Sequence, residues 1–258
     1  MQNVKDISDN WNYSEIFTKY ERNENMDDNN KMIDDLYQYL IHYPSNLPYK
    51  LSKPHLENPS HGQTQFVDSL FKNMINGFFI ESGAYDGEHL SNTLFLERFR
   101  NWTGLLIEPN PSLFLKLLRK NRKSYAVNTC LSTKDYPSVE TFSSGKGACF
   151  GRILDHEGES SQNQTFKVKC YPLFSILQAI NRYEVDYFSL DIEGAEEGVL
   201  SKIPWEKVNI KLISIEHNKW RGGKLNLKHF MEKRGYKCVK EISDVGVAPD
   251  LIFEKETS

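Results

Sequence analysis

The chain has 258 residues, of which 39% are hydrophobic, and this is enough for one substantial core or for a domain of about 180 residues with an appendage. Its formal net charge of -3 argues against a protein whose main function is to bind nucleic acid, because such a protein needs a basic face. The polar N-terminus contains no apolar leader, and no window approaches the ~20 apolar residues that span a bilayer. The sequence as written is therefore expected to be soluble and cytoplasmic, without a transmembrane segment.

The N-terminal part of the chain predicts a mobile segment followed by a helical arm. Between Met32 and Tyr43 the apolar residues recur at intervals of three and four, which predicts an amphipathic helix. The prolines of 44–62 predict an irregular stretch, after which a helix resumes over Gln63–Met74. The expected organisation is a mobile N-terminal segment at 1–30, a helical and proline-rich arm at 31–75, and the main domain at 76–258.

The main domain shows short apolar runs that alternate with helical stretches. This alternation indicates an α/β fold with a mostly parallel sheet and helices on both of its faces. The runs expected to form strands are Gly77–Ile80, Gly104–Ile107, Tyr125–Cys130, Asp186–Leu190, Ile210–Ile215 and Leu251–Phe253. Residues 132–170 break the rhythm with glycines and short β-like pieces, so we expect an insertion of hairpins and loops at the carboxyl edge of the sheet.

Four cysteines occur in the chain, at positions 130, 149, 170 and 238. No two of them are close enough for a metal-binding clip or a redox motif. Free buried thiols are the preferred interpretation, and paired disulfides are the alternative.

The first motif that points to a ligand follows the strand at Phe78–Ile80. It is the turn Glu81-Ser82-Gly83-Ala84-Tyr85-Asp86-Gly87, and a helical pattern comes after it. Glycines in such a turn let the backbone approach a ligand, and the free amides of a helix start supply polar contacts. A dinucleotide fingerprint requires G-x-G-x-x-G, but Tyr85 occupies the middle position, which favours S-adenosylmethionine over a nicotinamide dinucleotide. Glu81 or Asp86 would then contact the amino-acid end of the ligand, and a turn without a ligand is the alternative.

The second motif is Glu108, which ends the predicted strand Gly104–Ile107. An acid at the end of the second strand is where a doubly wound fold holds a ribose, because both ribose hydroxyls can donate to one carboxylate. Pro109 and Pro111 then end the strand and begin the next helix. A surface glutamate beside a proline turn is the alternative interpretation.

The third motif places Asp191 and Glu193 at the end of another predicted strand, where the strand period points both side chains the same way. They could hold the methionine moiety or orient the acceptor, and Asp191 is a candidate general base. A divalent metal would need more oxygen ligands than the sequence assigns, so no metal is predicted. In the alternative, Glu193 only begins the next helix. His217, which follows the predicted strand Ile210–Ile215, is the best-placed neutral candidate for a catalytic base, and His89 is a weaker one, although lone histidines are more often structural.

Three segments carry a resemblance to a known family: FFIESGAYDGE, WTGLLIEPNP and DYFSLDIEGAEEGVL. They resemble the FkbM-type S-adenosylmethionine-dependent methyltransferases, and the residues around the first two are most similar to the animal Star-like branch. The resemblance covers roughly residues 45–255, and its motifs occur in order at family spacing. It implies a Rossmann-like class I methyltransferase fold with a seven-stranded sheet, and S-adenosylmethionine as the cofactor.

The resemblance also implies site residues and partners. Its cofactor-binding positions fall on Glu81, Gly83, Ala84, Asp86, Gly87, Glu108, Asn128, Cys130, Asp191 and Glu193, with the stretch from Asn128 to Leu131 against the adenine. FkbM-type enzymes imply O-methylation of a sugar or small metabolite, so the expected partner is a small-molecule or glycan acceptor. The Star-like branch implies instead a catalytically silent module that binds membrane-cargo proteins in the endoplasmic reticulum, Golgi or endosomes. That branch is membrane-anchored, whereas this sequence has no such segment.

Overall fold

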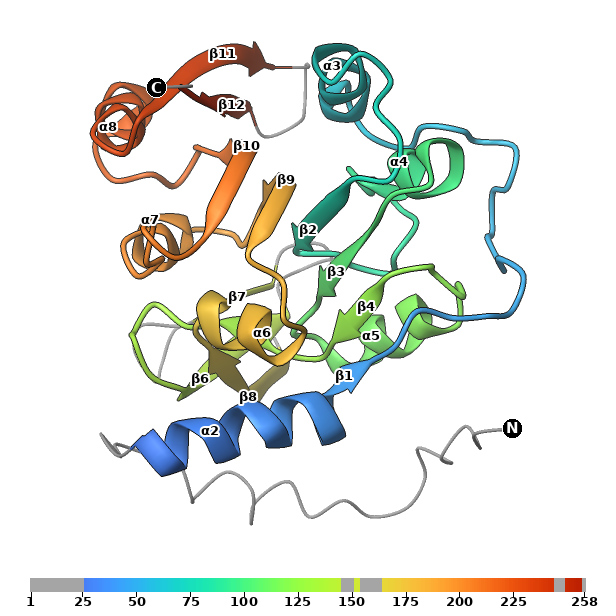
Figure 1. Cartoon of the computed structure of the whole chain (residues 1–258), viewed down its shortest axis with the longest axis vertical. Coiled ribbons are helices and arrows are strands. Elements are labelled where there is room, and N and C mark those ends of the chain that lie inside the picture. The colour runs from blue at the N-terminus through green and yellow to red at the C-terminus, as the bar shows by residue number, and fades with distance from the viewer. Residues whose placement is uncertain (1–25, 145–150, 154–163, 244–248, 257–258) are drawn as a thin grey trace.

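The structure, a computed structural model, describes residues 26–144, 151–153, 164–243 and 249–256. The predicted N-terminal segment 1–30 lies almost entirely outside these residues. A large mixed sheet runs through the molecule with helices around it, and a smaller sheet lies beneath it next to α2 in the view of Figure 1. No helix of the described ranges combines the length and the apolarity that crossing a membrane requires.

The large sheet has eight strands in the order β1-β4-β3-β2-β9-β10-β12-β11. Their bounds are β1 (Ile41–His42), β2 (Phe78–Ser82), β3 (Thr103–Ile107), β4 (Tyr125–Val127), β9 (Glu184–Leu190), β10 (Asn209–Glu216), β11 (Tyr236–Ile242) and β12 (Asp250–Lys255). The pairs from β4 through β10 are parallel, whereas β1, β12 and β11 join by antiparallel pairing. The expected α/β sheet is therefore present, but the expected count of seven strands is wrong. The additional strand, β1, comes from the N-terminal arm and is too short to leave a periodic signal.

The helices are α2 (Met26–Asp35), the π-helical turn η1 (Leu36–Leu40), α3 (Gln63–Leu70), α4 (Leu94–Arg100), α5 (Pro111–Leu118), α6 (Leu173–Ala179), α7 (Glu196–Leu200) and α8 (Gly223–Glu232). The helix predicted over Met32–Tyr43 begins earlier, at Met26. The helical segment ends sooner, at Leu40, because Ile41 pairs with Val127 at the edge of the sheet. The helix expected directly after the first glycine turn begins only at Leu94, and the residues before it form a loop.

The core consists of two apolar layers, one on each face of the large sheet. Phe78 and Ile80 of β2 belong to one layer and Phe79 to the other, because successive side chains of a strand point to opposite faces. The first layer packs against α2, α6, α7 and α8, and the second against α3, α4 and α5. Burial on both faces explains why these strands read as unbroken apolar runs.

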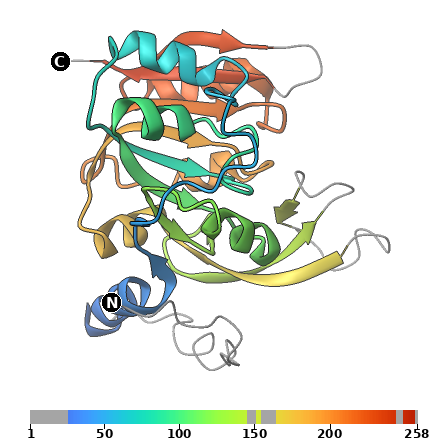
Figure 2. The ribbon, with the colours of Figure 1, turned by 90° about the vertical axis from the view of Figure 1, so that its right-hand side faces the viewer.

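The described strands of the insertion predicted at 132–170 form the smaller sheet together with β5, which precedes the predicted bounds, in the order β5-β8-β6-β7; residues 145–150 and 154–163 of the insertion lie outside the described residues. Its strands are β5 (Cys130–Leu131), β6 (Ser138–Ser144), β7 (Gly151–Ile153) and β8 (Gln164–Tyr171). The β6 and β8 strands, green and yellow in Figure 2, extend well away from the large sheet.

A disulfide joins Cys130 to Cys170, so the preferred interpretation of free thiols is wrong for this pair. The parallel register of β5 and β8 sets the two residues opposite each other, and this pairing is not visible in the linear spacing. Cys238 is a free cysteine, and Cys149 lies outside the described residues.

Candidate functional site

The turn after β2 is built against the ends of two neighbouring strands. The backbone N–H groups of Gly83 and Ala84 both donate to the carbonyl of Ile107 at the end of β3, at 3.1 Å each. Gly83 has φ +87°, and a Cβ at this position would collide with the carbonyl oxygen of Asp191 just after β9. Glycine is therefore required here both by the backbone conformation and by the close approach. The turn, β3 and β9 meet at one point on the carboxyl edge of the sheet.

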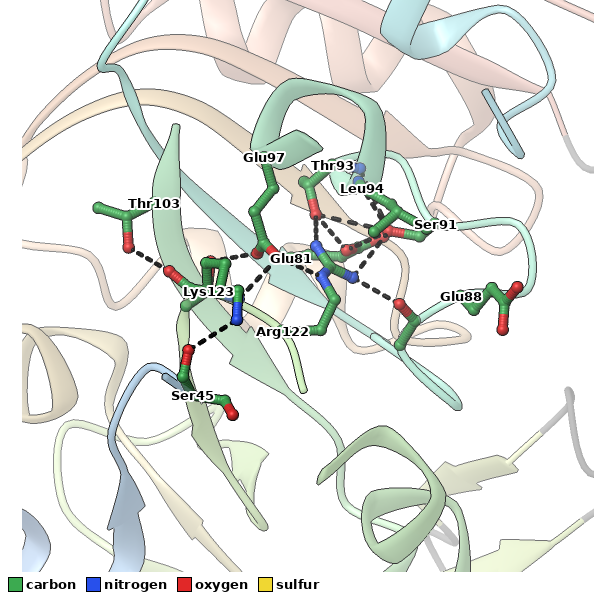
Figure 3. Close-up of polar contacts among 12 residues, drawn as sticks. Ser45, Glu81, Glu88, Ser91, Thr93, Leu94, Glu97, Thr103, Arg122 and Lys123 are labelled. Carbon is green, nitrogen blue, oxygen red and sulfur yellow. Dashed lines mark hydrogen bonds and ion pairs between the residues drawn. The ribbon is translucent and has the colours of Figure 1, made fainter. Parts of the chain in front are cut away.

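Glu81 is buried behind this turn, where its carboxylate holds the loop that leads to α4. It accepts a hydrogen bond from the backbone N–H of Asn92 at 2.7 Å. It also accepts from the hydroxyls of Ser91 and Thr93 (Figure 3). Burial raises the pKa of Glu81, and the nearby Arg122 guanidinium opposes that shift. The structure thus places the Glu81 carboxylate among loop residues, and its contact with a cofactor stays a prediction.

Asp86 and Gly87 shape the second half of the turn. The Oδ1 atom of Asp86 accepts from the backbone N–H of His89 at 2.7 Å and of Glu88 at 3.0 Å, which is an Asx-type turn. Gly87 has φ +77°, and a Cβ there would press on the side chain of Leu117 in α5. Asp86 therefore stabilises the turn through its own backbone neighbours.

Glu108 sits at the end of β3 with its carboxylate buried under the turn. In the described part of the chain its oxygens accept from two backbone N–H groups, those of Tyr85 and Asn110, each at 2.8 Å. Burial raises the pKa of Glu108 to about 7, although the two N–H groups favour the charged form. The Nδ2 atom of Asn128 donates to the backbone carbonyl of Glu108 at 2.7 Å. The acid predicted for the ribose and the asparagine predicted for the adenine side are thus neighbours.

Three carboxylates come together at the ends of β9 and β10. Oxygens of Asp191, Glu193 and Glu216 all lie within 4.8 Å of one another. The strand β9 ends before Asp191, and Glu193 has φ +61°, so a turn rather than strand alternation brings the first two together. The buried Glu196 carboxylate fixes this turn by accepting from the backbone N–H groups of Ile192 and Gly194.

The acidic groups of this edge strongly affect one another's protonation. Asp191 and Glu216 hydrogen-bond to each other through their carboxyl groups. The side chain of Asp191 reaches solvent, yet the dense protein around it, together with Glu216, raises its pKa well above the usual value. Burial and the charge of Glu193 raise the pKa of Glu216 to about 7, and burial raises the pKa of Asp250 to about 6. Asp191 and Glu216 therefore titrate as a coupled pair, in which the protonation of each carboxyl group depends on that of the other.

Three carboxylates are also the ligand type that hard divalent cations prefer. Here Glu193 already forms an ion pair with Lys219, and Asp191 and Glu216 already bind each other. We assign no metal ion to this group.

Sequence reasoning did not select Glu216. The available signal was that Glu216, like Glu81, Glu108 and Asp191, is an acid at the carboxyl end of an apolar strand.

The structure brings His217 beside different groups from those around Asp191. Its backbone N–H donates to the carbonyl of Pro249 at 3.2 Å, and the charged side chains that influence its ring are Glu241, Lys224 and Lys228. Burial lowers the pKa of His217. Its Nε2 atom is buried with no hydrogen-bond partner among the described residues.

Comparison with known proteins gives one family match and several solved structures of low sequence identity. The model of the methyltransferase FkbM domain matches residues 81–238, which is more than half of the chain. No curated protein matches the sequence. Among solved structures, the N-terminal domain of human METTL16 is 12% identical, with a TM-score of 0.43, over 95% of this chain and 90% of that one. A TehB-like SAM-dependent methyltransferase from Corynebacterium glutamicum is 10% identical, with a TM-score of 0.40, over 76% and 88% of the two chains.

Proposed function

Because this chain belongs to the methyltransferase FkbM domain family, we propose that it transfers the methyl group of S-adenosylmethionine to a hydroxyl of a sugar or small metabolite. One observation carries the proposal. The turn after β2 is hydrogen-bonded to Glu108 on one side and packed on the backbone of Asp191 on the other. Three strand ends therefore form one continuous site at the edge where open α/β sheets bind their ligands.

The residues of this site fit the proposed cofactor. Glu108 accepts only two backbone N–H groups within the described chain and has lone pairs left for the two ribose hydroxyls. The three carboxyl groups of Asp191, Glu193 and Glu216 outnumber the single nearby cation, Lys219, and this excess of acidic groups suits an ammonium and a sulfonium group. Gly83 and Ala84 would place backbone beside the methionine end, and the stretch from Asn128 to Cys130 would flank the adenine.

The carboxyl groups of Asp191 and Glu216 carry out the proposed acid–base chemistry. When bound, the cofactor supplies an electrophilic methyl group on a positively charged sulfur. A carboxylate of the pair takes the proton of the acceptor hydroxyl as the new O–CH₃ bond forms and the S–CH₃ bond breaks, a role that contributes ~10²–10⁴-fold to the rate. Orientation of the two reactants by the surrounding strand ends contributes the larger share. His217 is the second candidate base, and it would act from its own buried environment.

The charge of the edge also favours one class of acceptor. Once Glu216 and Asp250 ionise, at pKa values of about 7 and about 6, their charges would repel a phosphate or carboxylate group brought close to them. A neutral hydroxyl compound, such as a sugar, avoids this repulsion. This supports a glycan or small neutral metabolite as the acceptor.

Two measurements test the proposed function. Calorimetry should give micromolar binding of S-adenosylmethionine and of its demethylated product, and the absence of binding would reject the proposal. Incubation with methyl-labelled cofactor and a panel of neutral sugars and glycans should label at least one compound. Cofactor binding without turnover, together with specific capture of a membrane-cargo protein, would favour the alternative of a catalytically silent binding module in trafficking.

A further inference from the structure

We propose that Glu88 is a positioning residue through which the arm segment, defined here as residues 45–56, fixes the geometry of the cofactor turn. This inference rests on the proposed function. Glu88 directly follows Gly87 and is buried, with an exposed fraction of 6%. Its carboxylate faces the arm segment, where it accepts from the backbone N–H of Ser52 at 2.7 Å and of Lys53 at 2.6 Å.

A buried lysine completes this junction. The Nζ atom of Lys120 lies 2.6 Å from Oε2 of Glu88 and donates to the hydroxyl of Ser52 at 2.7 Å. The same Nζ lies 3.6 Å from Oδ2 of Asp86, which belongs to the turn. Burial alone would raise the pKa of Glu88, but the bonds from Lys120, Ser52 and Lys53 outweigh it and lower the pKa to about 2. One carboxylate, charged at all physiological pH values, thus joins the turn, the arm segment and the loop before β4.

A second junction, at the start of the arm segment, also leads to the turn. The backbone N–H of Ser45 donates to the carbonyl of Arg122 at 3.0 Å. The guanidinium of Arg122, which Figure 3 labels, is buried and donates to the carbonyl of Gly87 at 2.6 Å. The last glycine of the turn is therefore held from both sides, by Arg122 through its carbonyl and by Glu88 through the next residue.

The arm segment depends on these contacts because the described structure gives it no helix or strand of its own. Further side chains bind its carbonyls: Arg98 donates to Pro54 and Leu56, and Asn121 donates to Pro48. A segment without a helix or strand stays docked only while side chains from the rest of the protein satisfy its backbone polar groups. Because some of these side chains also hold the turn, docking of the arm segment and formation of the turn depend on each other.

Such an arrangement couples arm docking to cofactor binding, and the coupling works in both directions. A cofactor that needs the formed turn stabilises the docked arm, and a weakened dock reduces cofactor affinity. Glu88 need not touch the cofactor for this effect.

The first test is Glu88→Gln, which keeps the size of the side chain but removes its charge and one acceptor oxygen. We expect the affinity for S-adenosylmethionine and for its demethylated product, measured by calorimetry, to fall at least tenfold. Asp68→Asn is the matched control, because Asp68 is also a buried carboxylate, bound to Arg100 at 2.6 Å, but joins α3 to α4 without contacting the turn. This control should lose thermal stability and keep its affinity within twofold. Equal affinities for Glu88→Gln and the unmodified chain, or equal losses in both variants, would overturn the proposal.

A second measurement needs no variant. Hydrogen exchange of the unmodified chain should slow at the Ser52 and Lys53 amides when the demethylated cofactor is added, by a larger factor than in β11 at the far edge of the sheet. Slowing no greater than in β11 would overturn the proposal even if Glu88→Gln fails to fold. Failure of the unmodified chain to bind the cofactor would reject the proposed function instead, so the two failures are distinguishable.

Discussion

The backbone N–H of Tyr85 donates to the carboxylate of Glu108 at 2.8 Å, and this bond joins the turn after β2 to the end of β3. Tyr85 has φ +52°, a left-handed conformation that few non-glycine residues adopt. The residue that distinguishes this turn from a dinucleotide fingerprint is thus held by the acid proposed to bind the ribose. Turn geometry and ribose recognition depend on the same carboxylate.

Glu108→Gln should therefore weaken cofactor binding more than it destabilises the fold. The variant loses charge-assisted bonds to the ribose hydroxyls, so we expect affinity to fall about tenfold to a hundredfold. The loss of one backbone contact should lower the free energy of unfolding by about 1 kcal/mol. Calorimetry and urea titration measure the two effects. Glu140→Gln, which removes a surface ion pair with Lys134, is the control, and unchanged affinity in Glu108→Gln would contradict the assignment.

Gly83→Ala should be far more damaging than an alanine at another left-handed glycine. At Gly83 the added Cβ meets the carbonyl of Asp191, whereas at Gly235, with φ +78°, nothing lies within 4 Å. The conformational cost, about 1–2 kcal/mol, is common to both positions. Urea titration should show that cost alone for Gly235→Ala and at least ~2 kcal/mol more for Gly83→Ala. Equal destabilisation would mean that the turn does not pack on β9 as described.

The free energy of unfolding should fall as the pH rises through neutrality. The pKa values of Glu108 and Glu216 are raised from 4.5 to about 7 in the folded chain, so the folded state holds protons that the unfolded state releases. Their stabilising contribution is complete below about pH 4.5 and disappears as the pH passes about 7, by up to ~3 kcal/mol for each group. Urea titrations from pH 5 to 8 should show this decline. A flat profile would argue against buried carboxyl groups with raised pKa values at this edge.

Glu88 has the opposite dependence, because its pKa is lowered to about 2. Its contribution is present above about pH 4.5 and is lost as the pH falls toward 2. In urea titrations, Glu88→Gln should reduce the loss of unfolding free energy below pH 4.5 and leave its decline between pH 5 and 8 in place. A change only in the decline between pH 5 and 8 would mean that a group other than Glu88 causes the loss at acid pH.

Asp191→Asn should reduce the turnover number by ~10²–10⁴-fold once an acceptor is known, because it removes one member of the proposed base pair. Glu216→Gln should reduce turnover and also shift the acid limb of the pH–rate profile, since each carboxyl sets the protonation of the other. His217→Gln tests the second candidate. Full activity in Asp191→Asn with loss in His217→Gln would transfer the role of base to the histidine.

Reduction of the disulfide between Cys130 and Cys170 should destabilise the smaller sheet. The bond closes a loop over a sequence separation of 40 residues, for which the expected contribution is about 2–4 kcal/mol. Urea titration with and without a reductant measures it, and the double variant Cys130→Ser with Cys170→Ser should reproduce the reduced form. Cys238→Ser is the control, because Cys238 is a free cysteine. A reductant effect in Cys238→Ser as large as in the unmodified chain is expected, and its absence would point to a different pairing.

The strands that carry the site could be predicted because their signal is local. A strand buried on both faces needs an unbroken apolar run, and such runs precede Glu81, Glu108 and Asp191. The edge strand β11 could not be predicted in the same way, since its side chains are mostly half-buried or exposed. The helix expected directly after the first turn was displaced because Glu81 binds the loop at Ser91–Thr93, and no spacing rule encodes that contact.

The sequence by itself determined the alternation of strands and helices and the acids that end the strands, because both depend on neighbours within a few residues. Only the tertiary structure decided which distant groups meet. It set Glu216 against Asp191, Cys130 opposite Cys170, and the Glu88 carboxylate on the backbone of Ser52. Each of these contacts follows from the order and register of strands or from the docking of an irregular segment. Those features are selected by the packing of the whole core, which no local pattern contains.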